Sequence, residues 1–221
     1  MVWFLRRFRP ADPDPQGPEG VARRGHREYV GGLWDEIGAL QLAFLQRQGL
    51  KPEHYLIDIA CGALRLGVKA IPYLERGHYL GIEKEHQLLE AGAELELGAE
   101  LLDAKQPQLL CDRHFRFRRF HQQADMAMAQ SLFTHLPPRL IERCLRKLRP
   151  CLTRDGVCFA TFFEVEQPRA NPAQPHDHGY FAYTRDQMLG FGEHQGYEAR
   201  YIGDWDHPRG QVMVAYHPKH R

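Results

Sequence analysis

The chain has 221 residues, of which 43% are hydrophobic and 26% charged, and its formal net charge at pH 7 is +1. This length suits one domain with a substantial core, and the composition is that of a globular protein rather than a disordered or fibrous one. A net charge near zero provides no general field to attract nucleic acid or an anionic membrane. We therefore expect a small-molecule partner, with neither nucleic acid nor membrane.

The cysteine content and the length of the apolar runs indicate the cellular compartment. The five cysteines form no CxxC pair, so they indicate neither a disulfide framework nor a zinc ribbon. No window approaches the ~20 apolar residues of a membrane span. The apolar run at the start of the sequence is too short for a signal peptide. A reducing, cytoplasmic setting fits these features best.

The N-terminal part is rich in residues that break regular structure. Residues 10–25, PADPDPQGPEGVARRG, hold four prolines and three glycines, so we expect residues 1–25 to be a flexible lead. Residues 26–221 would then form a single domain. The first helix is predicted over 34–48, because apolar residues recur there at spacings of three and four.

From residue 55 onward, strand and helix patterns alternate. Strands are predicted over 55–60, 78–83, 108–112, 124–131 and 156–164, helices over 64–74, 86–104, 137–152 and 184–196, and two last strands over 197–205 and 210–217. This alternation predicts an α/β, doubly wound, mostly parallel sheet with helices on both faces. The two last strands have only a short loop between them, so they must be antiparallel.

The first strand runs into a loop with the features of a cofactor site. In an open parallel sheet, ligands bind beyond the carboxyl ends of the strands, and the first strand-to-helix turn carries the cofactor. That turn is LIDIACGALRLG, residues 56–67. Asp58 lies in the strand, Gly62 lets the backbone approach a ligand closely, and the following helix offers free N–H groups to an anion.

The glycine content of this loop discriminates between cofactors. A nicotinamide dinucleotide requires GxGxxG here, but from residue 60 the sequence offers Ala60, Gly62 and Arg65. A smaller cofactor with one carboxylate and no phosphates needs less space. Glu83 ends the second strand and is placed to accept hydrogen bonds from two ribose hydroxyls. S-adenosylmethionine meets both conditions.

At these positions the chain resembles the class I S-adenosylmethionine-dependent methyltransferases. The segments that carry the resemblance are LIDIACGALRLG (56–67), YLGIEKE (79–85), DMAMAQSLFTHLPP (125–138) and LRPCLTRDGVCFATFF (148–163). Their order, over roughly residues 28–217, is more specific than any one of them. The resemblance implies a Rossmann-like methyltransferase fold with a seven-stranded sheet whose last strand is antiparallel.

The resemblance also implies positions for the cofactor. Asp58, Ala60 and Gly62 would surround the methionine moiety, Glu83 would hold the ribose, Asp112 would face the adenine amino group, and Gln130 and Ser131 would lie beside the cofactor. The family loop often reads DxGxGxG, whereas this chain has Ala60 and Leu64 at the outer glycine positions.

A segment before the first helix, HREYVGGLWDEIG (26–38), resembles an N-terminal segment that covers the cofactor in some small-molecule members. We therefore expect residues 26–48 to include a lid, hinged at Gly31 and Gly32, with Tyr29 and Trp34 as apolar cover. The alternative is a surface turn whose aromatic side chains pack on the core.

Methyl transfer from a sulfonium is a direct displacement, so orientation matters most, and it can supply ~7–11 kcal/mol. A general base helps when the acceptor loses a proton, and histidine is the natural candidate. His135 is the first choice, with a helix-entry residue bonded to backbone as the alternative. His176 and His178 lie in an acceptor-side insertion, residues 165–183, and His178 is the second choice. The run HDH is a weak candidate for a divalent metal, and we expect none.

Three further features of the sequence could belong to a functional site. Arg65 follows the cofactor loop, where either the cofactor carboxylate, Asp58 or Glu36 would rationalise a cation. The run DRHFRFRRFH, residues 112–121, interleaves arginine and phenylalanine, which suits either single-stranded nucleic acid or, as we favour, a strand-like solvated edge. His207 lies in the last hairpin, where turn chemistry is favoured over catalysis.

The sequence thus predicts a cytoplasmic S-adenosylmethionine-dependent methyltransferase that acts on a small molecule, most favourably at oxygen. Two other classes stay open. One is a non-catalytic member that keeps the fold and the cofactor site. The other is an NAD(P)-dependent oxidoreductase, which the missing glycines disfavour.

Overall fold

The computed structural model of the chain describes residues 14–178 and 181–219. The strands are Leu56–Ile59 (β1), Tyr79–Glu83 (β2), Gln108–Cys111 (β3), Ala124–Ala129 (β4), Leu152–Glu164 (β5), Ala182–Tyr183 (β6), Tyr197–Gly203 (β7) and Val212–Pro218 (β8). The α-helices are Gly17–Arg24 (α1), His26–Tyr29 (α2), Trp34–Arg47 (α3), Gly67–Tyr73 (α4), His86–Ala91 (α5), Gly98–Lys105 (α6), Pro138–Leu148 (α7) and Arg185–Glu193 (α8).

The main sheet has the strand order β3-β2-β1-β4-β5-β8-β7, and β6 pairs with β5 beside this path. Strands β1 to β5 are parallel, whereas β8 runs antiparallel to both β5 and β7. The predicted doubly wound α/β fold with seven main strands and an antiparallel last strand is confirmed. All four residues of β1 are buried, as expected for a central parallel strand that is covered on both faces.

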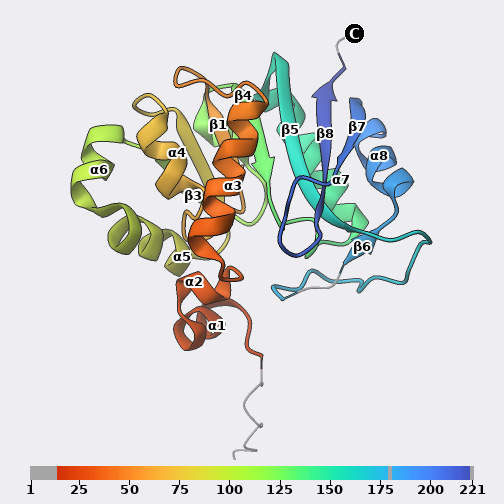
Figure 1. The fold of residues 1–221 in the computed structure, drawn as a ribbon, viewed down its shortest axis with the longest axis horizontal. Helices are drawn as coiled ribbons and strands as arrows, with labels where there is room; N and C mark the ends of the chain where they lie inside the picture. The colour runs from red at the N-terminus through yellow and green to blue at the C-terminus, as the bar shows by residue number, and fades with distance from the viewer. Residues whose placement is uncertain (1–13, 179–180, 220–221) are drawn as a thin grey trace, which may run out of the picture.

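Helices cover both faces of the sheet (Figure 1). On one face, α3 and α4 pack on strand residues such as Leu56 and Met128. On the other, α7 and α8 pack on residues such as Ile57 and Ala127. Successive residues of a strand therefore pack into opposite core layers, because side chains alternate across a strand. None of the helices among the described residues is long and apolar enough to cross a membrane.

The expected flexible lead is wrong for residues 17–24, which form α1. Proline suits the first turn of a helix, where its missing N–H has no partner to lose. Val21 is buried and packs in a small cluster with Tyr29, Trp34 and Leu88. Proline content thus marked a helix start rather than disorder. Residues 1–13 of the expected lead lie outside the described residues.

Two other predicted elements differ in detail. The helix expected over 86–104 is divided by a π-helical turn, Gly92–Leu97, and α6 begins directly after it at Gly98, whose φ is +77°. The strand-like edge expected in 112–121 is wrong, because Phe117–Phe120 is a 3-10 helix with both phenylalanines buried in the core. These rings are therefore not available to stack on nucleic-acid bases.

The packing of α8 on β8 gives a prediction about stability. A Cβ at Gly192 would lie 2.3 Å from Cδ1 of Tyr216, a fully buried residue whose hydroxyl donates to the Met188 carbonyl at 2.8 Å. We expect Gly192→Ala to lower the free energy of unfolding by about 1–3 kcal/mol through overpacking, measured by urea denaturation. Gly190→Ala is the matched control, since its Cβ would meet nothing closer than 4.0 Å. Equal stability of the two variants would contradict the prediction.

Candidate cofactor site

The loop after β1 has a backbone of unusual conformation. Ala60, Gly62 and Leu64 have φ values of +58°, +55° and +68°. This left-handed region favours glycine, and other residues adopt it at a cost of roughly 1–2 kcal/mol each. The three positions are the glycine positions of the DxGxGxG pattern, so the backbone conformation is retained although two glycines are replaced. Non-glycine residues held in this region cluster at ligand sites.

Glu83 fixes this loop from the neighbouring strand. Its carboxylate is buried and accepts three backbone N–H groups: Gly62 at 3.1 Å, Lys84 at 2.7 Å and Glu85 at 3.0 Å. Burial raises the pKa of Glu83, and the three N–H groups oppose that rise. The carboxylate therefore joins the loop after β1 to the loop after β2. A carboxylate has about four acceptor positions, so one is left for a ligand hydroxyl.

Asp58 lies within β1, and its side chain is hydrogen-bonded to a side chain of the neighbouring strand β2. Its carboxylate accepts the hydroxyl of Tyr79 at 2.6 Å. Burial raises the pKa of Asp58 to about 7, against the opposing effects of Tyr79 and Arg65. The group is thus close to half-protonated at neutral pH.

Arg65 connects the loop to the N-terminal segment. Its guanidinium donates to the carbonyls of Val30 at 3.3 Å and Gly32 at 2.9 Å, and to Oε1 of Gln130 at 2.7 Å. None of these three oxygens belongs to a carboxylate. The N–H groups that make these bonds are therefore bonded to neither Asp58 nor Glu36, the two carboxylates of the chain that could rationalise a cation here. Burial lowers the pKa of Arg65 to about 10, and the side chain therefore stays charged at neutral pH.

A cluster of polar side chains lies where β4 ends, beside Thr161 of β5 and Gln211, which directly precedes β8. Ser131 donates its backbone N–H to Thr161 Oγ1 at 2.7 Å, and Thr161 donates to Gln211 Oε1 at 2.6 Å. Nε2 of Gln130 lies 2.8 Å from Ser131 Oγ and 3.2 Å from Nε2 of His207. So many buried polar groups at one edge of a sheet are typical of a functional site. Gln130 and Ser131 are expected near the cofactor from the sequence, whereas no local sequence signal points to Thr161 or Gln211.

His207 makes the contact expected of a turn residue and also a contact to a distant residue of the polar cluster. The expected turn chemistry is present, because Nδ1 accepts the backbone N–H of Arg209 at 3.2 Å. The ring is also buried, stacks on Trp205 and reaches Gln130. Burial, with Arg65 and Arg209 nearby, lowers the pKa of His207 to about 4. The ring is therefore neutral at physiological pH.

Asp112, expected to face the adenine, is bound within its own turn. Its carboxylate accepts the backbone N–H groups of His114 at 2.6 Å and Arg116 at 3.2 Å, and Nε of Arg116 lies 2.6 Å away. Burial would raise the pKa of Asp112, but these donors outweigh it and hold the pKa below its ordinary value. The turn therefore keeps the carboxylate ionised.

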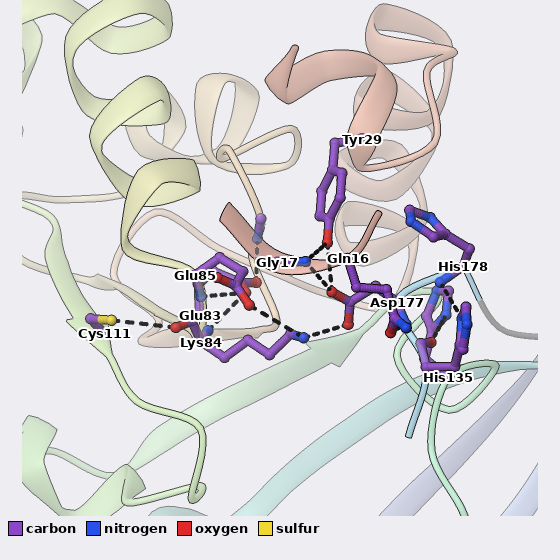
Figure 2. A network of polar contacts seen from close by, with 12 residues as sticks. Gln16, Gly17, Tyr29, Glu83, Lys84, Glu85, Cys111, His135, Asp177 and His178 are labelled. Carbon is purple, nitrogen blue, oxygen red and sulfur yellow. Dashed lines mark hydrogen bonds and ion pairs between the residues drawn. The ribbon is translucent and has the colours of Figure 1, made fainter. Parts of the chain in front are cut away.

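The two candidate bases lie together where the insertion meets the loop after β4 (Figure 2). Nδ1 of His135 is 3.0 Å from the His176 carbonyl, which is the backbone-bonded alternative considered for it. Burial lowers the pKa of His135 to about 4. Nε2 of His178 is 3.2 Å from the Pro15 carbonyl, and its ring packs edge-on against Tyr29. Within residues 14–178 and 181–219, no group of three or more His, Cys, Asp or Glu side chains could hold a metal ion.

The N-terminal segment packs onto this edge of the sheet. Val30 lies over the cofactor loop, since a Cβ at Gly62 would be 2.8 Å from its Cγ1. Tyr29 is buried, and its hydroxyl donates to Asp177 Oδ2 at 2.5 Å while accepting the Gly17 N–H at 2.7 Å. Figure 1 shows α1, α2 and the segment between β5 and β6 at the end of the sheet toward which the parallel strands point.

Solved structures share this fold. No family model matches the sequence. The magnesium protoporphyrin IX methyltransferase of Synechocystis PCC 6803 with bound SAH superimposes with a TM-score of 0.63 at 12% identity, over 92% of this chain and 95% of that one. DhpI in complex with SAH gives 0.64 at 13% identity, over 90% and 93%. DesVI of Streptomyces venezuelae gives 0.60 at 12% identity, over 91% and 96%.

These matches cover most of the chain, and they establish its fold. The protein has the fold of the class I S-adenosylmethionine-dependent small-molecule methyltransferases. Of the three structures named above, two carry SAH.

Proposed function

We propose that the protein is an S-adenosylmethionine-dependent methyltransferase that acts on a small-molecule acceptor, at oxygen. The observation that carries the proposal is the loop after β1. Its three left-handed residues and the Gly62 N–H bonded to Glu83 give it the backbone conformation that a cofactor loop at this position would need, although two glycines are replaced. The matched structures with bound SAH support the same cofactor.

The residues of the site fit this cofactor by their chemistry. The remaining acceptor position of Glu83 would take one ribose hydroxyl, rather than the two expected from the sequence. Arg65 is a buried cation whose three protein contacts are neutral oxygens, and it would pair with the cofactor carboxylate. Gly62, Ala60 and Asp58 would line the methionine side, Asp112 the adenine side, and Gln130 and Ser131 would lie between cofactor and acceptor.

The cofactor, when bound, would supply a methyl group on a sulfonium, so that an O–C bond to the acceptor would form as the C–S bond breaks and SAH leaves as the thioether. The protein therefore has to align the acceptor and exclude water. Tyr29 and Val30 of the N-terminal segment would close over the site as its lid. The contact of Nδ1 with the His176 carbonyl places the ring proton of His135 on Nδ1 and a lone pair on Nε2. Because burial lowers the pKa of His135 to about 4, the ring is neutral at physiological pH and would act as the base, with His178 beside it.

Calorimetric titration tests the cofactor assignment. We expect SAH to bind and NADH not to bind. The variant Arg65→Gln should bind SAH about tenfold more weakly, because one charge-assisted contact is lost. Its affinity for 5′-methylthioadenosine, which lacks the carboxylate, should fall less than its affinity for SAH. Binding of NADH alone, or of none of these ligands, would refute the proposal. Binding of SAH without turnover across an acceptor panel would favour the non-catalytic alternative.

A further inference from the structure

One carboxylate joins three segments that are far apart in the sequence (Figure 2). Asp177 Oδ2 accepts the backbone N–H of Gly17 at 3.0 Å and the hydroxyl of Tyr29 at 2.5 Å. Oδ1 accepts Nζ of Lys84, the residue that follows β2. The carboxylate is only 12% exposed, so these donors take the place of most of its water.

The neighbours of Asp177 attach the same stretch of chain on two sides. Its own backbone N–H donates to Gln16 Oε1 at 3.0 Å. On the other side, the backbone N–H of His176 donates to the His135 carbonyl at 3.1 Å, and His135 Nδ1 returns a contact to the His176 carbonyl. The insertion therefore extends from β5, past the loop after β4, to the end of β2.

The N-terminal segment has a second attachment at its other end. Arg65 donates to the carbonyls of Val30 and Gly32, and Arg209 donates to the carbonyl between them, that of Gly31. Gly31 and Gly32 have φ values of +98° and +59°, which glycine adopts without strain. The segment is thus held at a glycine pair on one side and by Asp177 on the other.

We propose that Asp177 is a positioning residue that clasps the N-terminal segment and the acceptor-side insertion into one cover over the cofactor. This inference rests on the proposed function for the identity of the ligand, whereas the clasp itself is a property of the ligand-free chain. The cofactor side and the acceptor side close through the same carboxylate, so neither cover opens independently of the other. Release of the product SAH then requires the Asp177 contacts to break.

The first test needs no ligand. Asp177→Asn removes the charge and keeps the shape, and its matched control is Asp155→Asn, an exposed residue near the opposite end of β5. By hydrogen exchange, we expect the amides of Gly17 and of residues 26–30 to exchange about tenfold faster in Asp177→Asn and unchanged in Asp155→Asn. Unchanged exchange in both variants would overturn the clasp.

A second pair of variants keeps the test valid if Asp177→Asn folds poorly. Tyr29→Phe removes one hydroxyl from the clasp, and Tyr73→Phe removes a hydroxyl that donates to the Leu50 carbonyl at 2.8 Å, outside it. We expect faster exchange of the Gly17 amide in Tyr29→Phe alone. The double variant Tyr29→Phe/Asp177→Asn should show less than the sum of the two single effects, because both changes weaken or remove the Tyr29–Asp177 contact. Additive effects would show that the two residues act separately and would overturn the proposal.

The dissociation rate of SAH connects the clasp to function. In stopped-flow displacement, SAH should leave Asp177→Asn about tenfold faster than the wild type and Asp155→Asn at the wild-type rate. An unchanged rate in Asp177→Asn would refute the role in product release. A wild-type protein that binds no SAH would refute the proposed function instead, and the exchange experiment would still decide the clasp.

Discussion

Replacing Glu83 with alanine is expected to lower the free energy of unfolding by about 3 kcal/mol or more, because three backbone N–H groups lose their acceptor at once. The donors are those of Gly62, Lys84 and Glu85, at 2.7 to 3.1 Å. Urea denaturation at pH 7 measures the loss. Glu100→Ala, on the exposed side of α6, is the control and should change stability by less than ~0.5 kcal/mol.

A second substitution separates this structural role from ribose binding. Glu83→Gln keeps one carbonyl oxygen and should recover part of the stability that alanine loses. Its amide places two hydrogens where the carboxylate had acceptor positions, so SAH should bind at least tenfold more weakly than to the wild type. If Glu83→Gln binds SAH normally while the folded protein is intact, Glu83 holds the loop but does not hold the ribose.

The order of strands and helices could be predicted from the sequence because it is a local property. Each strand and helix has its own hydrophobic period, and right-handed crossovers restrict how parallel strands connect. The helix α1 was missed because its stability depends on Val21 packing against residues farther along the chain, such as Leu88. Proline-rich composition alone could not reveal that contact.

The cofactor loop shows how a sequence pattern and a backbone conformation differ. At the level of sequence, Ala60 and Leu64 depart from the DxGxGxG pattern. The structure keeps both residues at positive φ, because the neighbouring contacts, including the Gly62 to Glu83 hydrogen bond, fix the loop. The cost is of the order of 1–2 kcal/mol for each residue. The backbone conformation of a loop can therefore be retained where its sequence motif is not.

The polar contacts above the sheet could not be read from the sequence, because their partners are far apart in the chain. In the HDH run, the sequence favours the two histidines as functional residues. The side chain that accepts hydrogen bonds from Gly17, Tyr29 and Lys84 is that of Asp177 between them. His207 looked like turn chemistry because its other partner, Gln130, lies 77 residues away. Only the fold brings such residues to one edge of the sheet.

Asp58 should make the stability of the protein decrease as the pH rises from about 4 to about 7. Burial raises the pKa of Asp58 to about 7 in the folded state, whereas an aspartate in an unfolded chain has a pKa of about 3.9. The folded state therefore holds a proton that the unfolded chain has released. Its advantage is fully present below the unfolded pKa and is lost as the pH rises through the folded one.

The variant Asp58→Asn isolates this contribution, because asparagine keeps an acceptor for the Tyr79 hydroxyl and does not titrate. From urea denaturation at several values between pH 4 and pH 8, the unfolding free energy of the wild type should fall relative to Asp58→Asn by up to about 4 kcal/mol, or ~1.4 kcal/mol per pH unit. Parallel curves for the two proteins would contradict the raised pKa. Tyr79→Phe adds a check of cause: its hydroxyl favours the ionised carboxylate, so removing it should move the descending part of the curve to higher pH.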